Sequence, residues 1–298
     1  MSYKAQITRL NPTCILFILD QSGSMGEPFG GQTGIQGSKA QQLATAINGL
    51  LYDLVLECVK RPEEGPRNYC QVGLIGYGSR SVNVGSAFVG SLAGQYLVWV
   101  RDLANNPARI EDRFQKVDDG AGGLVDFSIK FPIWVDPVAE NGTPMEEALH
   151  KAYTILEPWV RSHPHSYPPL VIHITDGEPN PNTDPSKPAG DLRKLATDDG
   201  NVLVFNLHLS SQSSSPILYP ESDTGLPDQY AKQLFQMSSV LPTTMQLFQM
   251  AGGNTMKQLA GKFGCRIGSQ SRGFVFNANS DSMFKSLSLF LMYLFYST

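Results

Sequence analysis

The side chains of Asp20, Ser22 and Ser24 carry oxygen atoms at alternate positions of one short segment. This segment directly follows an apolar run, residues 14–19, which is typical of a fully buried strand. The carboxylate and the two hydroxyls are therefore predicted to lie above the end of a strand, where open α/β sheets bind their ligands. Hard oxygen ligands of this kind favour Mg²⁺ or Mn²⁺ over zinc.

Two later segments offer further oxygens. Thr143 precedes a Pro-Met-Glu sequence, and Asp176 follows the apolar run 170–175. Each has a simpler interpretation by itself, since Thr143 and Glu146 could form a helix capping box and Asp176-Gly could form a turn. Together with the first segment they supply two carboxylates and three hydroxyls. Five oxygens are enough for a six-coordinate hard cation with one position left for a ligand.

The elements that must position these side chains alternate along the chain. Apolar runs bounded by Gly, Pro and Asp predict strands, and apolar residues at spacings of three and four predict helices. The predicted strands are residues 14–19, 71–77, 81–89, 170–175, 201–209 and 274–277, and the predicted helices are residues 38–60, 143–160, a segment including 192–196, and 281–295. This alternation predicts an α/β fold with a mostly parallel sheet and helices on both faces.

The chain of 298 residues is predicted to form a single domain, residues 1–298, with long insertions at about 90–140 and 210–253. Loops of this length are usually functional or flexible. The second insertion follows the strand that ends at residue 209, so it should emerge on the same sheet edge as the metal. We therefore expect it, with part of the first insertion, to frame the metal and select a partner.

Composition excludes several classes of protein. The net charge of −4 and the scattered distribution of the 23 Lys and Arg residues argue against a nucleic-acid or anionic-membrane partner.

The longest apolar stretch, residues 287–296, is too short to span a bilayer and is predicted to be a buried helix, with a docking surface as the alternative. The start of the chain lacks the apolar core of a signal peptide. The four cysteines, Cys14, Cys58, Cys70 and Cys265, are predicted to be reduced thiols of a cytoplasmic protein, with a Cys14–Cys70 disulfide as the alternative.

The order Asp20-x-Ser22-x-Ser24, then Thr143, then Asp176 resembles the metal-ion-dependent adhesion site (MIDAS) of von Willebrand factor type A (vWA) domains. The resemblance covers roughly residues 13–295 apart from the two insertions. It implies a Rossmann-like sheet with one antiparallel edge strand, here residues 81–89, and a bound Mg²⁺, with Mn²⁺ and Ca²⁺ as alternatives. It also implies the ligands: hydroxyls of Ser22, Ser24 and Thr143, and carboxylates of Asp20 and Asp176 acting directly or through water.

Such a site is predicted to bind rather than to catalyse. Two carboxylates roughly neutralise a divalent cation, which then stays electrophilic toward one more anionic oxygen. The family resemblance implies that an Asp or Glu of a partner protein supplies it. Similarity to stand-alone bacterial vWA proteins, including those of the tellurite-resistance type, implies a cytoplasmic signalling or stress-response module that works with a serine/threonine kinase and a PP2C-type phosphatase.

Three other functions agree less well with the sequence. A Mg²⁺-dependent phosphohydrolase of the haloacid dehalogenase type needs a second acid two residues after the first, and Ser22 stands there. A Ser-His-Asp hydrolase needs a nucleophile elbow that the Ser24 segment lacks, and His173 lies in an apolar strand where a core histidine is expected. A scaffold that uses metal for stability alone is the third function, and the open coordination position argues against it.

Overall fold

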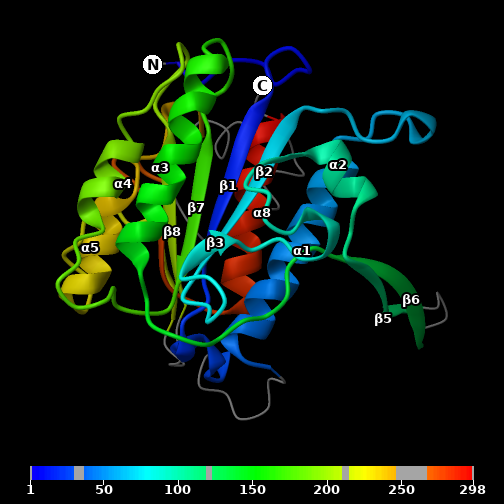
Figure 1. Cartoon of the computed structure of the whole chain (residues 1–298), viewed down its shortest axis with the longest axis horizontal. Helices are drawn as coiled ribbons and strands as arrows, with labels where there is room; N and C mark the ends of the chain where they lie inside the picture. Colours follow the sequence, from blue (N-terminus) through cyan, green and yellow to red (C-terminus); the bar gives the residue numbers. More distant parts are fainter. Residues whose placement is uncertain (1, 30–36, 119–122, 210–214, 246–266, 297–298) are drawn as a thin grey trace.

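A mostly parallel sheet forms the centre of the molecule in the computed structural model, which describes residues 2–29, 37–118, 123–209, 215–245 and 267–296 (Figure 1). Its strand order is β3-β2-β1-β7-β8-β10-β9, with β4 pairing β2 beside β3. The parallel strands are β1 (Thr13–Asp20), β2 (Cys70–Tyr77), β7 (Leu170–Thr175), β8 (Leu203–Leu209) and β10 (Phe274–Ala278). The fold predicted from the sequence, a Rossmann-like α/β sheet, is confirmed.

Short antiparallel strands close both edges of this sheet. β3 (Val84–Ser86) and β4 (Val98–Trp99) pair with β2, and β9 (Ile217–Leu218) pairs with β10. The predicted antiparallel edge strand at residues 81–89 is therefore present as β3 but is only three residues long.

Helices cover both faces of the sheet (Figure 1). One layer holds α3 (Met145–Ser162), α4 (Ser186–Leu192) and α5 (Gln229–Met237), and the other holds α1 (Lys39–Glu57), α2 (Val100–Asn105) and α8 (Ser280–Tyr296). Along β1, Ile15, Phe17 and Leu19 belong to the core beneath α1 and α8, while the intervening residues belong to the core beneath α3. Because both faces are covered, β1 is an uninterrupted apolar run rather than an alternating one.

The helix predicted to include residues 192–196 is placed differently in the structure. α4 ends at Leu192, and Ala196 instead pairs with Asn201 in an isolated β-bridge. Pro188 lies in the first turn of α4, where a helix leaves backbone N–H groups unpaired and a proline is therefore tolerated. The alternative of a Cys14–Cys70 disulfide is wrong, since both are free thiols. Cys265 lies outside the described residues.

The first predicted insertion contains an antiparallel hairpin of β5 (Arg109–Asp118) and β6 (Leu124–Ile133). These strands form a two-stranded sheet of their own, which projects from the body beyond α1 (Figure 1). The buried side chain of Asn48 on α1 anchors the end of β6, because its Oδ1 accepts from the N–H groups of Trp134 (2.8 Å) and Val135 (3.1 Å). These bonds tie one end of the hairpin to the core.

The second predicted insertion contains β9 and α5. Residues 210–214, which follow β8, lie outside the described residues, as do residues 246–253. The predicted role of this insertion in framing a metal thus stays a prediction. No helix among the described residues has the length and apolar character needed to cross a membrane.

Candidate metal centre

The five residues proposed as metal ligands come together at the carboxyl edge of the sheet. β1 and β7 are parallel neighbours, with Leu19 opposite Ile174, so Asp20 and Asp176 leave the sheet side by side. The hydroxyl of Ser24 donates to Asp176 Oδ1 (2.8 Å) and lies 3.1 Å from that of Ser22. The hydroxyl of Thr143 faces the same space, since a Cβ built on Gly177 would lie 3.7 Å from Ser24 Oγ and 4.0 Å from Thr143 Oγ1.

Backbone contacts lock the loops of the site together. Gly23 N–H donates to the carbonyl of Asn141 (2.8 Å), and Asn141 N–H donates to that of Gly78 (2.7 Å). Gly78 has a φ of +93°, and a Cβ there would lie 2.5 Å from the carbonyl oxygen of Gly142. Glycine is therefore required for the loop after β2 to approach the loop that carries Thr143.

The capping interpretation of Thr143 and Glu146 is wrong. α3 begins at Met145, and Pro144 at the N-cap position makes no side-chain capping bond. Glu146 instead accepts from the N–H of Asp184 (3.0 Å). The backbone of Thr143 is held by Asn180, whose Oδ1 accepts from its N–H (2.8 Å), while its hydroxyl bonds to none of the described residues. That hydroxyl is therefore available to a ligand.

Asp20 is buried and fully engaged. Its Oδ1 accepts from the N–H of Ser22 (2.9 Å), and its Oδ2 accepts from the hydroxyls of Thr175 (2.7 Å) and Tyr77 (3.2 Å). Burial raises the pKa of Asp20, and the neighbouring charge of Asp176 raises it further. Thr175 and Tyr77 were not identified from the sequence, although the parallel pairing of β1 with β2 places Tyr77 opposite Asp20.

Lys39 is the main feature of the site that the sequence did not suggest. Its ammonium lies 2.5 Å from Asp176 Oδ2 and 3.0 Å from Glu27 Oε2, and its side chain is 3% exposed. Lys39 is the first residue of α1, where the helix dipole disfavours a positive charge. A lysine at the start of a helix is unfavourable by itself, and this is the sequence signal that could have identified Lys39 as a candidate residue of the site.

A chain of buried polar groups continues from Asp20 across the sheet. The Tyr77 hydroxyl lies 2.8 Å from His173 Nε2, and His173 Nδ1 lies 2.8 Å from Asn206 Oδ1. Asn206 in turn donates to the hydroxyl of Ser238 (2.8 Å), just after α5. Burial lowers the pKa of His173 to about 4. The prediction that His173 is a hydrogen-bonded core histidine is confirmed.

The oxygen atoms of the site fit a hard divalent cation. An octahedral Mg²⁺ with ligands at about 2.1 Å separates neighbouring oxygens by about 3.0 Å. The Ser22–Ser24 and Ser24–Asp176 oxygen separations, 3.1 Å and 2.8 Å, match this spacing. Within the described parts of the chain no three His, Cys, Asp or Glu side chains form a potential metal site, so the hydroxyls are essential to this one.

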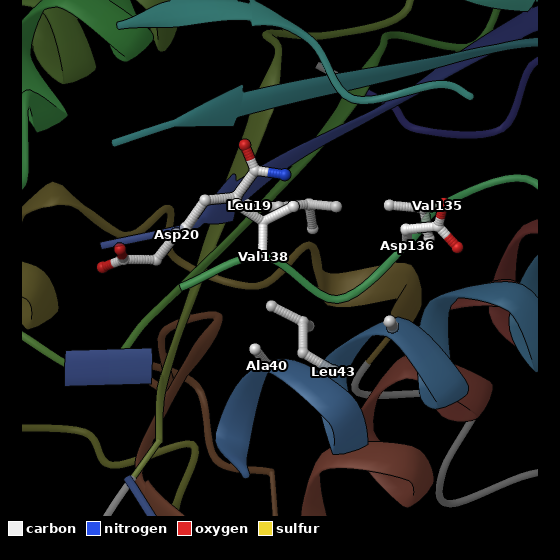
Figure 2. Close-up of a pocket in the computed structure, with 9 residues that line it drawn as sticks. Leu19, Asp20, Ala40, Leu43, Val135, Asp136 and Val138 are labelled. Atoms are coloured by element: carbon white, nitrogen blue, oxygen red, sulfur yellow. The ribbon is translucent and has the colours of Figure 1, made fainter. Parts of the chain in front are cut away.

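One small hollow lies beside Asp20, on the side of α1. Figure 2 shows a hollow between Asp20, Ala40 and Leu43 of α1, and Val138. Its volume is about 10 Å³, which is the size of about one water molecule. An organic substrate has no room in this hollow.

Comparisons with known proteins gave matches in structure alone. No protein-family model and no curated protein matches the chain. Among solved structures, the chain is similar to proximal thread matrix protein 1 from the mussel byssus (15% identity, 77% of this chain and 42% of that chain, TM-score 0.41). It is also similar to manganese-loaded TRAP protein of Plasmodium vivax (16%, 68% and 59%, 0.35) and to the PilB minor pilin of Streptococcus sanguinis (12%, 96% and 61%, 0.40). The chain thus spans less than two thirds of each of these structures.

Proposed function

We propose that this protein is a vWA-like interaction module that binds an acidic residue of a partner protein through a Mg²⁺ ion held by Asp20, Ser22, Ser24, Thr143 and Asp176. The observation that carries the proposal is the convergence of these five residues, from three separate segments, at one edge of the sheet, with the Ser22, Ser24 and Asp176 oxygens at separations that suit an octahedral cation. The ion would supply Lewis acidity, and the protein residues supply the oxygens and their orientation. Mn²⁺ and Ca²⁺ are alternative occupants.

The charges around the site support an anionic partner. Asp20, Asp176 and Lys39 together carry a formal charge of −1, because the ammonium of Lys39 offsets one carboxylate. A divalent cation would leave this buried group with a charge of +1. The third carboxylate nearby, Glu27, is 57% exposed and is screened by solvent. A partner carboxylate would complete both the coordination and the charge.

A binding role agrees better with these contacts than catalysis does. Both oxygens of Asp20 already accept hydrogen bonds from Ser22, Thr175 and Tyr77, so its carboxylate is fixed in place and is not exposed as a nucleophile. A bacterial signalling role with a serine/threonine kinase and a PP2C-type phosphatase is the finer proposal, and it rests on the family resemblance alone.

The first test is calorimetric titration of Mg²⁺ and Mn²⁺ into the wild type, Asp20→Ala and Asp136→Ala. Asp136 is the matched control, because it lines the same hollow but pairs with Arg109 (2.8 Å) instead of the oxygen cluster. Loss of an outer-shell partner typically weakens metal binding about 10–100-fold. We expect Asp20→Ala to weaken cation binding by more than this. Asp136→Ala should bind normally, and equal affinities in all three proteins would contradict the metal site.

The second test is capture of a partner from native lysate by the same three proteins, in Mg²⁺ and in EDTA. A partner held by the wild type and Asp136→Ala in Mg²⁺, and lost in EDTA and in Asp20→Ala, supports metal-dependent recognition. A cation that raises the melting temperature while every captured protein is retained in EDTA would instead favour a scaffold stabilised by metal.

A further inference from the structure

The β5–β6 hairpin exposes apolar side chains and backbone edges that nothing in the described structure covers. Ile110, Phe114, Val125 and Phe127 are 60%, 73%, 48% and 57% exposed. The hairpin forms a separate two-stranded sheet, so among the described residues no third strand pairs with either outer edge. Isolated two-stranded sheets are marginally stable in water, and exposed apolar edge strands are sites of pairing with another chain. The hairpin therefore lacks a strand partner.

We propose that this partner is the β6 strand of a second copy of the protein, paired antiparallel about a twofold axis at Ser128. Two hairpins would then form one continuous sheet of four strands in the order β5-β6-β6-β5. Figure 1 shows the hairpin projecting away from the body. This proposal is independent of the metal site.

The sequence of β6 is complementary to itself in this register. With Ser128 opposite its own copy, Asp126 lies opposite Lys130 of the second copy, and Lys130 lies opposite the second Asp126. Opposite charges on directly facing residues of an antiparallel pair stabilise it. Two such ion pairs would flank the twofold axis on one face of the sheet.

The other face of the same pairing is apolar. Phe127 lies opposite Ile129 of the second copy, and Val125 lies opposite Phe131. Pairing would therefore cover the two exposed apolar side chains of β6, Val125 and Phe127. Aromatic and β-branched side chains form favourable pairs across strands, so both faces of the interface gain contacts.

Alternative registers lose this complementarity. Directly facing residues of an antiparallel pair have their side chains on the same face of the sheet, and a twofold axis perpendicular to the sheet does not exchange its faces. Each residue of β6 must therefore face a residue of the same face in the second copy, so the axis always passes between two copies of one residue. The alternative registers place the axis at another residue of β6. Centred on Phe127, the pairing puts Asp126 opposite Ser128 and Lys130 opposite Leu124. Centred on Ile129, it puts Asp126 opposite Pro132 and Lys130 opposite Ser128. The register about Ser128 is the one of these three that pairs the two charges.

The charges of β6 are accessible to a second copy. Lys130 pairs with Asp112 (2.6 Å) and Asp126 pairs with Lys116 (3.3 Å) within the hairpin, and all four side chains are more than half exposed. Exposed ion pairs of this kind contribute little to stability. Each charge can therefore face an additional partner across the edge without giving up a strong contact.

Charge reversal tests the pairing by sedimentation velocity of the full chain. Wild type should sediment as a dimer, whereas Lys130→Glu and Asp126→Lys should each weaken dimerisation by at least about tenfold, because each opposes like charges twice per interface. Mixing the two variants should restore association, since the mixed pair again opposes Asp with Lys and Glu with Lys. Lys194→Glu is the matched control, an exposed lysine paired with Asp191 on the body, and should remain dimeric.

A cysteine at the axis tests the register itself. Directly facing residues of an antiparallel pair have Cα atoms about 4.5–5.5 Å apart, which a disulfide can bridge. Ser128→Cys should form a covalent dimer on mild oxidation, while the wild type, whose described cysteines are buried, should not. A monomeric wild type, a dimer that both charge reversals leave intact, failure of the mixed variants to associate, or a dimer in which Ser128→Cys does not cross-link would each overturn the proposal.

Discussion

Replacement of Lys39 by methionine should affect stability in a way that depends on the divalent cation. The ammonium contacts Asp176 Oδ2 at 2.5 Å, and both side chains are almost fully buried, 3% and 0% exposed. Removing one partner of a buried ion pair costs about 3–5 kcal/mol, because the other charge is left uncompensated. In Lys39→Met, without metal, Asp20 and Asp176 would be left close together with no buried cation.

A divalent cation bound at the proposed site should offset much of this loss. Mg²⁺ would supply the missing positive charge, and it would no longer be repelled by the ammonium. At an effective dielectric constant of about 20, two unit charges 4 Å apart interact by about 4 kcal/mol, which sets the scale of that repulsion. We therefore expect Lys39→Met to bind Mg²⁺ at least about tenfold more tightly than the wild type.

Urea denaturation with EDTA and with saturating Mg²⁺, together with calorimetric titration, measures both effects. Lys194→Met is the matched control, since it removes an exposed ion pair with Asp191 and should change neither stability nor Mg²⁺ affinity noticeably. If Lys39→Met lost the same free energy of unfolding with and without Mg²⁺, or bound Mg²⁺ no more tightly, the role assigned to the ammonium would be refuted.

Three further perturbations follow from the contacts of the site. The pKa of His173 is lowered to about 4 in the folded protein, so the unfolded chain takes up this proton first as the pH falls. The contribution of His173 to stability should be complete above about pH 6.5 and fall by about 3 kcal/mol by pH 4. Burial also lowers the pKa of His208 to about 4, so urea denaturation across this range should show a loss that includes both histidines. Thr175→Val removes the hydroxyl that donates to Asp20 Oδ2 and should cost about 1–3 kcal/mol in the same assay, with weaker Mg²⁺ binding; an unchanged affinity would show that Thr175 does not orient Asp20. Gly78→Ala places a Cβ 2.5 Å from the carbonyl oxygen of Gly142 and should lower the melting temperature, and an unchanged value would mean that the two loops can separate freely.

The sequence predicted the sheet and its main helices because their patterns are strong and local. β7 occupies the predicted residues, and β1 and β2 match to within one residue, since both faces of each strand are buried and the runs are almost wholly apolar. The five candidate ligands could be assembled because each stands at a strand end or just before a helix, and parallel strands bring such ends to one edge. Thr143 is the exception, since its pattern equally suggested a cap that the structure does not contain.

The sequence could not predict the features that depend on long-range contacts or on surfaces without a core. Lys39 contacts Asp176 across 137 positions of the sequence, and no local pattern reveals that pairing. The β5–β6 hairpin was expected to be an irregular insertion. Its strands mix charged and apolar residues on both faces, with Phe114 and Phe127 exposed on opposite ones, so neither strand shows a single buried side.

The central position of β1 in the sheet has a kinetic consequence. β1 cannot complete its pairing in the sheet until β7 is in place. The Ser24 hydroxyl likewise cannot bond to Asp176, which lies 152 residues further along the chain, until both segments have come together. Parallel pairing over such distances closes large loops before any contact compensates for the lost entropy, so folding is slow and the site is completed late. Interactions that are absent from the transition state act on the rate of unfolding rather than on the rate of folding. A cation that needs both halves of the site would therefore lengthen the lifetime of the folded protein without helping it to fold.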